Sequence, residues 1–164
     1  MQRRIATGLL AGLIAGIAFT LVALFLRTTL PDGGRTSMLL VAAEAFHSHG
    51  PLAGWVASLV YTVIIGGIFG WLASAQPALD EVRLTLWGGL YGLAWWIVNG
   101  LVILPALFGK VPLSSAAIDS TRPVALASLI EHVLYGVILG YVFAVLAVYV
   151  DRRHATHATT HRAA

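Results

Sequence analysis

Apolar residues run along the chain in four long blocks, and charged residues interrupt these blocks almost only at their ends. Asp, Glu, Lys and Arg are missing from residues 5–26, 52–79 and 84–109, and residues 123–150 contain a single one, Glu131. Each block exceeds the roughly 20 apolar residues that an α-helix needs to cross the hydrocarbon core of a bilayer. We therefore predict an all-α membrane protein, a single domain over 1–164, with four transmembrane helices near 5–30, 52–75, 83–108 and 123–150.

The composition disfavours the alternative of four buried helices in a soluble protein. Hydrophobic residues make up 59% of the 164 residues and charged residues 10%, whereas a soluble domain carries about 25% charged residues. So few charges could not cover the surface of a soluble fold of this length. The first block is also longer than the apolar core of about 7–15 residues in a signal peptide, and no clear cleavage site follows it. We expect it to remain as a span.

The basic residues lie at the ends of the predicted helices, where Arg and Lys anchor a span among lipid headgroups. The net charge of +3 therefore indicates a lipid bilayer as partner, and we expect no nucleic acid. Four spans place both termini on one side, together with Arg3, Arg4, Arg83, Arg152, Arg153 and Arg162. The other side carries fewer basic residues, which are Arg27, Arg35, Lys110 and Arg122. Because cytoplasmic flanks carry the excess of Lys and Arg, we expect cytoplasmic termini and a cytoplasmic tail over 151–164.

The spacing of the glycines predicts an internal repeat. A shift of 70 residues places SLVYTVIIGGIFGWLAS (58–74) on SLIEHVLYGVILGYVFA (128–144), and Gly66 then matches Gly136 while Gly70 matches Gly140. A shift of 80 residues aligns the first and third helices through Gly8 with Gly88 and Gly12 with Gly92. Each repeat is a helical hairpin, which returns the chain to the side on which it started. We therefore predict two parallel copies related by an axis along the membrane normal, unlike the inverted repeats of many transporters.

Small residues recur at every fourth position in all four blocks, which places them on one face of each helix. In lipid, where no hydrophobic force drives helices together, close backbone approach along such small-xxx-small faces drives much of the association. We predict that the two hairpins pack through glycines at Gly8, Gly12, Gly16, Gly66, Gly70, Gly88, Gly92, Gly136 and Gly140.

Glu131 and His132 are the unusual residues of the fourth block. Ionisable side chains inside a membrane span are costly and usually face the bundle or a cavity. Glu131 follows Pro123 by eight residues, which places it roughly 12 Å along the helix at 1.5 Å per residue. His132 stands in the small-residue stripe, so we expect it to face protein. Burial in an apolar setting favours the uncharged form of both side chains.

Two interpretations of this intramembrane polar site stay open. In the functional interpretation, Glu131 is a proton or cation site helped by His132, Tyr135 and Asn99. In the structural interpretation, its carboxyl group makes a hydrogen bond to an imidazole, to Asn99 or to Tyr61. A bis-histidine haem site would need a second histidine at similar depth, and no other predicted span contains one.

The remaining polar segments offer weak candidates for metal binding, and we expect no metal or cofactor. The longest loop, 31–51, contains a turn at PDGGR and then MLLVAAEAFHSHG, which is typical of a short helix lying on the outer surface and ended by Gly50 and Pro51. Its possible ligands are Glu44, His47 and His49. The tail carries His154, His157 and His161 at helical spacing, although a frayed terminus is the commoner outcome. The chain has no cysteine, which excludes Cys-ligated clusters.

The second half of the chain resembles the YagU-like family of small four-helix bacterial inner-membrane proteins. The shared feature is a late helix reading G-H-hydrophobic-hydrophobic-Y/W-G-x-x-x-G before basic residues, which His132, Tyr135, Gly136 and Gly140 match. Glu131 stands where the family pattern has a small residue, so the resemblance assigns it no role. It implies four helices and a location in the bacterial inner (cytoplasmic) membrane. It implies no activity.

Two functions from different classes fit these observations. The first is a non-catalytic subunit or assembly partner of other membrane proteins, which the glycine stripes and the scarcity of reactive groups favour. The second is a small oligomeric channel or carrier, a homodimer for example, that moves protons or a small solute past Glu131 and His132. A membrane enzyme is the weakest alternative, because no set of residues resembles an active site.

Overall fold

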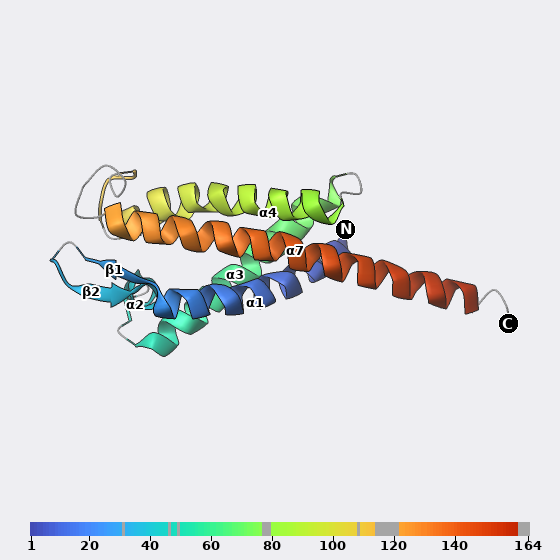
Figure 1. Cartoon of the computed structure of the whole chain (residues 1–164), viewed down its shortest axis with the longest axis horizontal. Helices are drawn as coiled ribbons and strands as arrows, with labels where there is room; N and C mark the ends of the chain where they lie inside the picture. Colours follow the sequence, from blue (N-terminus) through green and yellow to red (C-terminus); the bar gives the residue numbers. More distant parts are fainter. Residues whose placement is uncertain are drawn as a thin grey trace.

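The computed structural model describes residues 1–30, 32–45, 47–48, 50–76, 80–107, 109–113 and 122–160, with the backbone alone at 104, 107 and 149–160. The elements in chain order are α1 (Gln2–Phe25), β1 (Arg27–Thr29), β2 (Arg35–Ser37), α2 (Met38–Ala45), α3 (Pro51–Ser74), α4 (Glu81–Trp95), the π-helix η1 (Trp96–Ile103), α5 (Leu104–Leu107) and α7 (Arg122–Thr160). In this described part of the chain, the regular structure is helical apart from one small β-hairpin (Figure 1).

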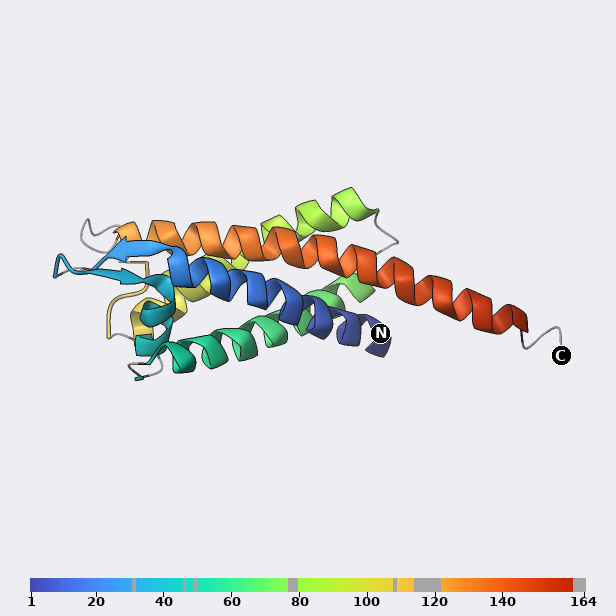
Figure 2. The ribbon, with the colours of Figure 1, turned by 60° about the horizontal axis from the view of Figure 1, so that its bottom comes forward.

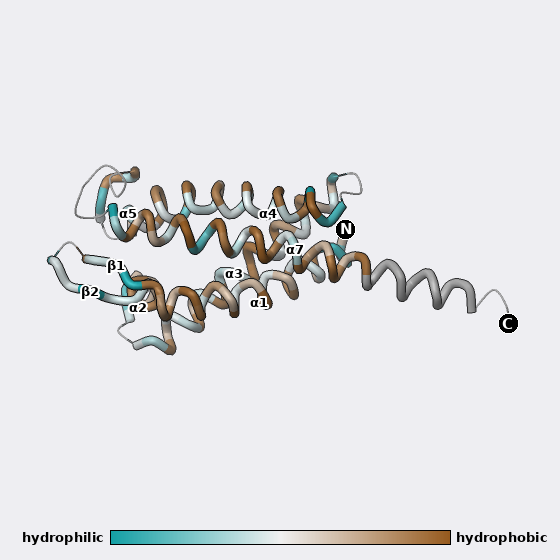
Figure 3. The backbone as a smooth tube through the Cα atoms, in the orientation of Figure 1, coloured by the Kyte–Doolittle hydropathy of each residue, from teal (hydrophilic) through white to brown (hydrophobic). Residues whose placement is uncertain are grey.

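Among the described residues, four helical segments are long and apolar enough to cross a membrane, which is the number that the sequence predicts. They are Gln2–Phe25, Pro51–Ser74, Glu81–Ile103 and Arg122–Val148. The hydropathy colouring in Figure 3 follows the same division, with the hydrophilic positions gathered mainly at the two ends of the helices. The N-terminus and the far end of α7 lie at the same end of the bundle (Figures 1 and 2). α7 itself continues beyond the bundle at that end, past the apolar part of the helix.

The four long helices pack in an open order rather than as a closed ring. α1 packs against α3, α4 against α7, and α1 against α7. Figure 2 shows α4 diverging from α7 at the end where the chain termini lie, while α3 passes behind α1 there. Side chains such as Tyr91 and Tyr61 bridge the space between α3 and α4. The bundle therefore has one side on which two neighbouring spans stand apart.

Glycines set the distance between α1 and α3. A methyl group added at Gly12 would lie 2.6 Å from the Thr62 carbonyl oxygen and 2.9 Å from the Gly66 Cα. One at Gly8 would meet the Gly66 carbonyl oxygen and lie 2.9 Å from the Gly70 Cα. Since these neighbours are backbone atoms, only glycine permits the approach.

The contact between α4 and α7 uses glycines in the same relative positions. A methyl group at Gly88 would meet the Gly136 carbonyl oxygen and lie 2.8 Å from the Gly140 Cα. One at Gly92 would meet the His132 carbonyl oxygen and lie 3.1 Å from the Gly136 Cα. His132 thus occupies the place in this interface that Thr62 occupies in the other.

The first helix ends earlier than the predicted end near residue 30. α1 stops at Phe25, and Arg27 then pairs with Ser37 at the start of an antiparallel hairpin. The turn is closed by the Asp32 carboxylate, whose Oδ1 accepts a hydrogen bond of 2.8 Å from the Gly34 amide. Gly33 adopts φ +86°, a conformation that favours glycine. The threonines of this stretch fit a strand better than a helix, because β-branched side chains favour extended backbone.

The short helix expected in the first loop is present as α2, but it does not lie exposed on the surface. Most of its residues are buried, namely Met38, Leu39, Val41, Ala43 and Ala45. Leu39 packs with Ala23 of α1 and Ala127 of α7, and Gly54 of α3 approaches the Leu39 carbonyl. α2 therefore closes the end of the bundle opposite the termini.

The third and fourth predicted helices also change in detail. The third consists of α4, the π-helical segment η1 and the short α5, so its turns widen from Trp96 onward. The fourth, α7, begins at Arg122 and runs to Thr160, well beyond the predicted end near residue 150. Its apolar part, Arg122–Val148, matches the predicted span. The histidines at 154 and 157 lie on this helix, their side chains outside the described structure, and His161 lies outside the described residues.

Candidate functional site

The polar residues of the spans gather where α7 passes between α1, η1 and α3. α7 carries Ser128, Glu131, His132 and Tyr135, which are all at most 5% exposed. η1 supplies Asn99, which the wide turns of the π-helix hold beside α7. Short π-helical insertions occur often at functional sites. Here the η1 segment is pinned to α7 by Trp96, whose indole NH donates a hydrogen bond of 3.0 Å to the Ala125 carbonyl oxygen.

His132 has both ring nitrogens within reach of partners. Its Nδ1 lies 2.8 Å from the Ser128 carbonyl oxygen and 3.3 Å from the Ser128 hydroxyl. Its Nε2 lies 3.5 Å from the Asn99 Nδ2. One tautomer satisfies both contacts: Nδ1–H donates to the Ser128 carbonyl, and Nε2 accepts from the Asn99 amide. The neutral imidazole is therefore a link between α7 and η1.

Aromatic rings enclose the remaining faces of this imidazole. Phe19 of α1 meets the His132 ring edge-on at a centroid distance of 5.9 Å. Tyr61 of α3 approaches it at 6.5 Å, with the ring planes inclined by 68°. Side chains from four different elements thus surround His132, which explains its low exposure.

Tyr135 holds α7 to α3 through its hydroxyl group, which donates a hydrogen bond of 2.6 Å to the Thr62 carbonyl oxygen. Tyr91 makes a similar bond from α4, donating to the Ile65 carbonyl oxygen at 2.7 Å. Both bonds reach across to α3, whose main packing partners among the described elements are α1 and α2. Sequence reasoning missed Tyr91, Trp96 and Ser128 as partners, because a donor to a backbone carbonyl leaves no spacing pattern in the sequence.

Glu131 does not join this network. Its side chain is 4% exposed, and its Oε1 has no hydrogen-bond partner within the described part of the chain. Among the described residues, His132 and Asn99 bond to each other, and the Tyr61 hydroxyl is also buried without a partner. The Glu131 Oε1 therefore makes none of the predicted bonds to His132, Asn99 or Tyr61 there, and a structural role of Glu131 stays a prediction.

The position of Glu131 follows from its neighbours one turn away on the same face. Ala127 packs in the outer cluster with Ala23 and Leu39, and Tyr135 packs in the central cluster with Phe19. Glu131 lies between them along α7, so it is buried where two apolar clusters meet. A buried polar group without a partner costs about 1–3 kcal/mol, and such a group calls for an explanation in function or in an absent partner.

The candidate metal ligands of the sequence can be placed in part. Among the described residues no three His, Asp or Glu side chains come close enough to share an ion. Glu44 and His47 of the loop are exposed, and His49 lies outside the described residues. One hollow lies on the surface of α1 near Phe25, and another lies between α3 and α4. Neither is lined by Glu131, His132 or Asn99.

These features are compatible with an integral membrane helix bundle that encloses a polar cluster. Comparison of the sequence and structure with family models, curated proteins and solved structures finds no match.

Proposed function

We propose that the protein is a non-catalytic membrane module that assembles with other membrane proteins or with a second copy of itself. The observation that carries this proposal is the use of the buried polar side chains. His132, Asn99 and Tyr135 bond to neighbouring helices and line neither hollow. Hydrogen bonds of this kind hold membrane helices together. The cluster thus serves cohesion rather than a reaction.

The outer face of α4 is the surface on which we place the partner. Only 28% of an apolar stretch of 18 residues is buried in the span Glu81–Ile103, compared with 44% of such a stretch in Arg122–Val148. Exposed apolar side chains form a stripe along it, at Val82, Leu86, Leu93 and Ile97. The glycine faces, by contrast, are already used inside the bundle.

Photocrosslinking in cells tests this proposal. A photoreactive amino acid at Leu86 or Ile97 should give protein adducts. The same probe at Leu10, which is similarly exposed on α1, should give far fewer. Lipid adducts alone at all three positions would contradict the proposal.

The finer features of the fold are part of the proposal. We infer that the two hairpins descend from one duplicated hairpin, supported by the parallel between the Gly8–Gly66 and Gly88–Gly136 contacts. We place both termini in the cytoplasm of a bacterium and the protein in its inner membrane. Half-exposed Trp71, Trp87 and Tyr141 near the end of the bundle that holds the termini fit an aromatic belt at a membrane boundary. The resemblance to YagU-like proteins stays a prediction.

A second function, a small oligomeric channel or carrier, has one specific observation in its favour. Glu131 is buried and its Oε1 has no partner among the residues that the structure describes, and an ionisable residue within a membrane span is a functional-site hypothesis by default. Proton or solute flux into liposomes, measured for wild type and Glu131→Gln, separates the two functions. Normal folding with lost flux would favour the channel or carrier. Absence of flux in both proteins favours the assembly module.

A further inference from the structure

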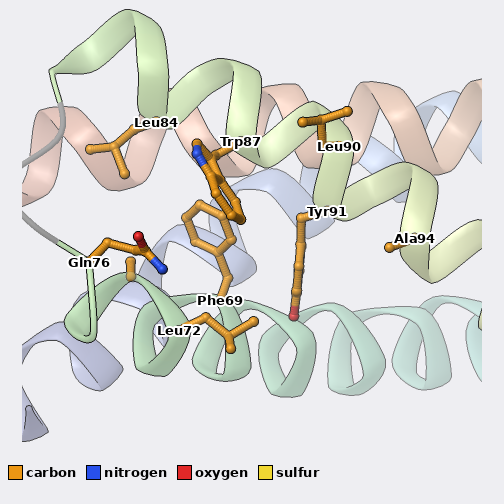
Figure 4. A pocket seen from close by; sticks show the side chains of 9 residues that line it. Phe69, Leu72, Gln76, Leu84, Trp87, Leu90, Tyr91 and Ala94 are labelled. Atoms are coloured by element: carbon orange, nitrogen blue, oxygen red, sulfur yellow. The ribbon is translucent and has the colours of Figure 1, made fainter.

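The hollow between α3 and α4 is an apolar groove at the end of the bundle that holds the termini. It has a volume of about 310 Å³ and is lined by Phe69, Leu72, Ala73, Gln76, Leu84, Trp87, Leu90, Tyr91 and Ala94. Figure 4 shows α4 rising away from α3 toward Leu84 and Gln76, so the groove widens in that direction. We call the wide end at Gln76 and Leu84 the mouth and the end at Ala94 the deep end. Between them the side chains are aliphatic or aromatic, and the Gln76 amide lies at the mouth.

We propose that this groove binds one acyl chain of an anionic phospholipid, whose phosphate group lies at the arginines that flank the mouth. The inference goes beyond the proposed assembly role and does not depend on it.

The groove arises where the repeat is asymmetric. In a duplicated hairpin, α1 corresponds to α4 and α3 to α7, so the contact between α1 and α7 has its counterpart between α4 and α3. α1 and α7 pack closely. α4 and α3 meet instead through side chains: Tyr91 donates to the Ile65 carbonyl, and Tyr61 contacts Trp95 at a ring-centroid distance of 6.3 Å. The backbones therefore stay apart, and the space between them opens sideways into the bilayer.

The width of the groove selects an acyl chain over a protein helix. At Tyr91 a single side chain spans the gap, with its hydroxyl 2.7 Å from the Ile65 carbonyl oxygen. The Phe69 and Tyr91 ring centroids are 5.2 Å apart. A helix with its side chains is about 10–12 Å across and does not fit such a gap. An acyl chain is a single row of methylene groups and does.

The length of the groove also suits one lipid leaflet. Its lining on α4 extends from Leu84 to Ala94, which is roughly 15 Å at 1.5 Å per residue. This is half of the approximately 30 Å hydrocarbon core of a bilayer. Beyond Ala94 the gap is closed by Trp95, which contacts both Tyr61 and Tyr91.

Basic groups at the mouth point to an anionic headgroup. The Arg4 guanidinium donates a hydrogen bond of 2.9 Å to the carbonyl oxygen of Ala73, a lining residue. Arg83 precedes the lining residue Leu84 and is exposed, with an ion pair of 3.5 Å to Asp80. Guanidinium groups present several donors to phosphate oxygens, and basic pockets between membrane helices on the cytoplasmic side bind anionic lipid headgroups.

Native mass spectrometry of the full chain tests the proposal, after reconstitution into nanodiscs of phosphatidylglycerol and phosphatidylethanolamine and gentle release. Wild type should retain one phosphatidylglycerol. Ala94→Phe should reduce this occupancy about tenfold, the loss expected when about two methylene groups are displaced from the groove. Ala6→Phe, the same change at an exposed position on α1, should leave it unchanged. Arg83→Gln should weaken the preference for phosphatidylglycerol over phosphatidylethanolamine.

Three results would overturn the proposal. Wild type released without lipid would do so, as would equal lipid retention by Ala94→Phe and Ala6→Phe. A second protein chain that is bound in wild type and lost in Ala94→Phe would mean that the groove holds a protein instead. Thermal unfolding of each variant, compared with wild type, shows whether lost lipid reflects lost structure.

Discussion

The Tyr135 hydroxyl of α7 lies 2.6 Å from the Thr62 carbonyl oxygen of α3, a contact between residues 73 positions apart in the chain. Both residues are almost fully buried. The bond joins the first hairpin to the second at the level of the polar cluster, where α1 is the main other connection between them. The two halves of the bundle are therefore held together by few polar contacts, each of which can be tested.

Removing the Tyr135 hydroxyl should loosen the connection between the hairpins. We expect Tyr135→Phe to lower the free energy of unfolding by about 0.6–1.7 kcal/mol, the range measured for hydrogen bonds between membrane helices. The measurement is equilibrium unfolding in mixed detergent micelles. Tyr141→Phe is the matched control, because Tyr141 is on the same helix and 49% exposed. Equal effects of the two changes would show that the hydroxyl bond contributes nothing.

Glycines at the helix contacts should tolerate no added methyl group, while other glycines should. We expect Gly136→Ala to destabilise the protein by about 1–3 kcal/mol through overpacking, because the added Cβ would meet the Gly88 carbonyl and lie 2.9 Å from the Gly92 Cα. Gly89→Ala is the same change on the facing helix, and its Cβ would meet only the Val137 Cγ2 at 3.3 Å.

Gly89→Ala should instead raise the stability of the protein, because alanine favours a helix by up to about 1 kcal/mol over glycine. Thermal unfolding of the two variants in one detergent gives the comparison. A stable Gly136→Ala protein would mean that the backbones of α4 and α7 can separate without cost.

The membrane topology is testable in cells. Reporter fusions after residues 40, 79 and 164 should read outside, inside and inside, because the excess of arginine lies with the termini. The structure already brings the N-terminus and the end of α7 to one end of the bundle. A fusion at 40 on the same side as one at 164 would contradict the four-span arrangement.

The four spans could be read from the sequence because the hydrophobic blocks are long and almost free of charge. The hairpin of Arg27–Thr29 and Arg35–Ser37 was missed, although its threonines favour extended backbone, because two strands of three residues are too short to form a pattern in the sequence. The π-helix η1 was missed for a related reason: the sequence from Trp96 to Ile103 is as apolar as an ordinary span. Its wide turns depend on packing against α7.

The polar cluster was predicted in part. The stripe of small residues correctly indicated that His132 faces protein, and His132 and Asn99 come together. The neighbours of Glu131 could not be derived from the sequence, because they depend on which turns of α1 and α2 pack opposite this part of α7. That depends on the angle between helices, which sequence spacing does not determine.

Glu131 and His132 are adjacent and equally buried, yet their removal should have opposite consequences. Replacing His132 by Leu removes the acceptor of Asn99 and the donor to the Ser128 carbonyl. Because Asn99 is then left with an unpaired amide, we expect a loss of about 1–3 kcal/mol in the free energy of unfolding. Glu131→Leu removes a carboxyl oxygen that has no partner among the described residues. It should be neutral or stabilising, since an unpaired buried polar group is replaced by an apolar one.

Unfolding of both variants and of Glu131→Gln in mixed micelles measures the difference. Glu131→Gln should unfold like wild type, because an amide and an uncharged carboxyl group have similar shapes and both stay unpaired here. A large loss of stability in Glu131→Leu would show that the carboxyl group has a partner in the membrane, such as a bound water or a group of another protein. A stable Glu131→Leu protein means instead that Glu131 costs stability and is retained for a role other than folding, which is the expectation for a residue that carries function.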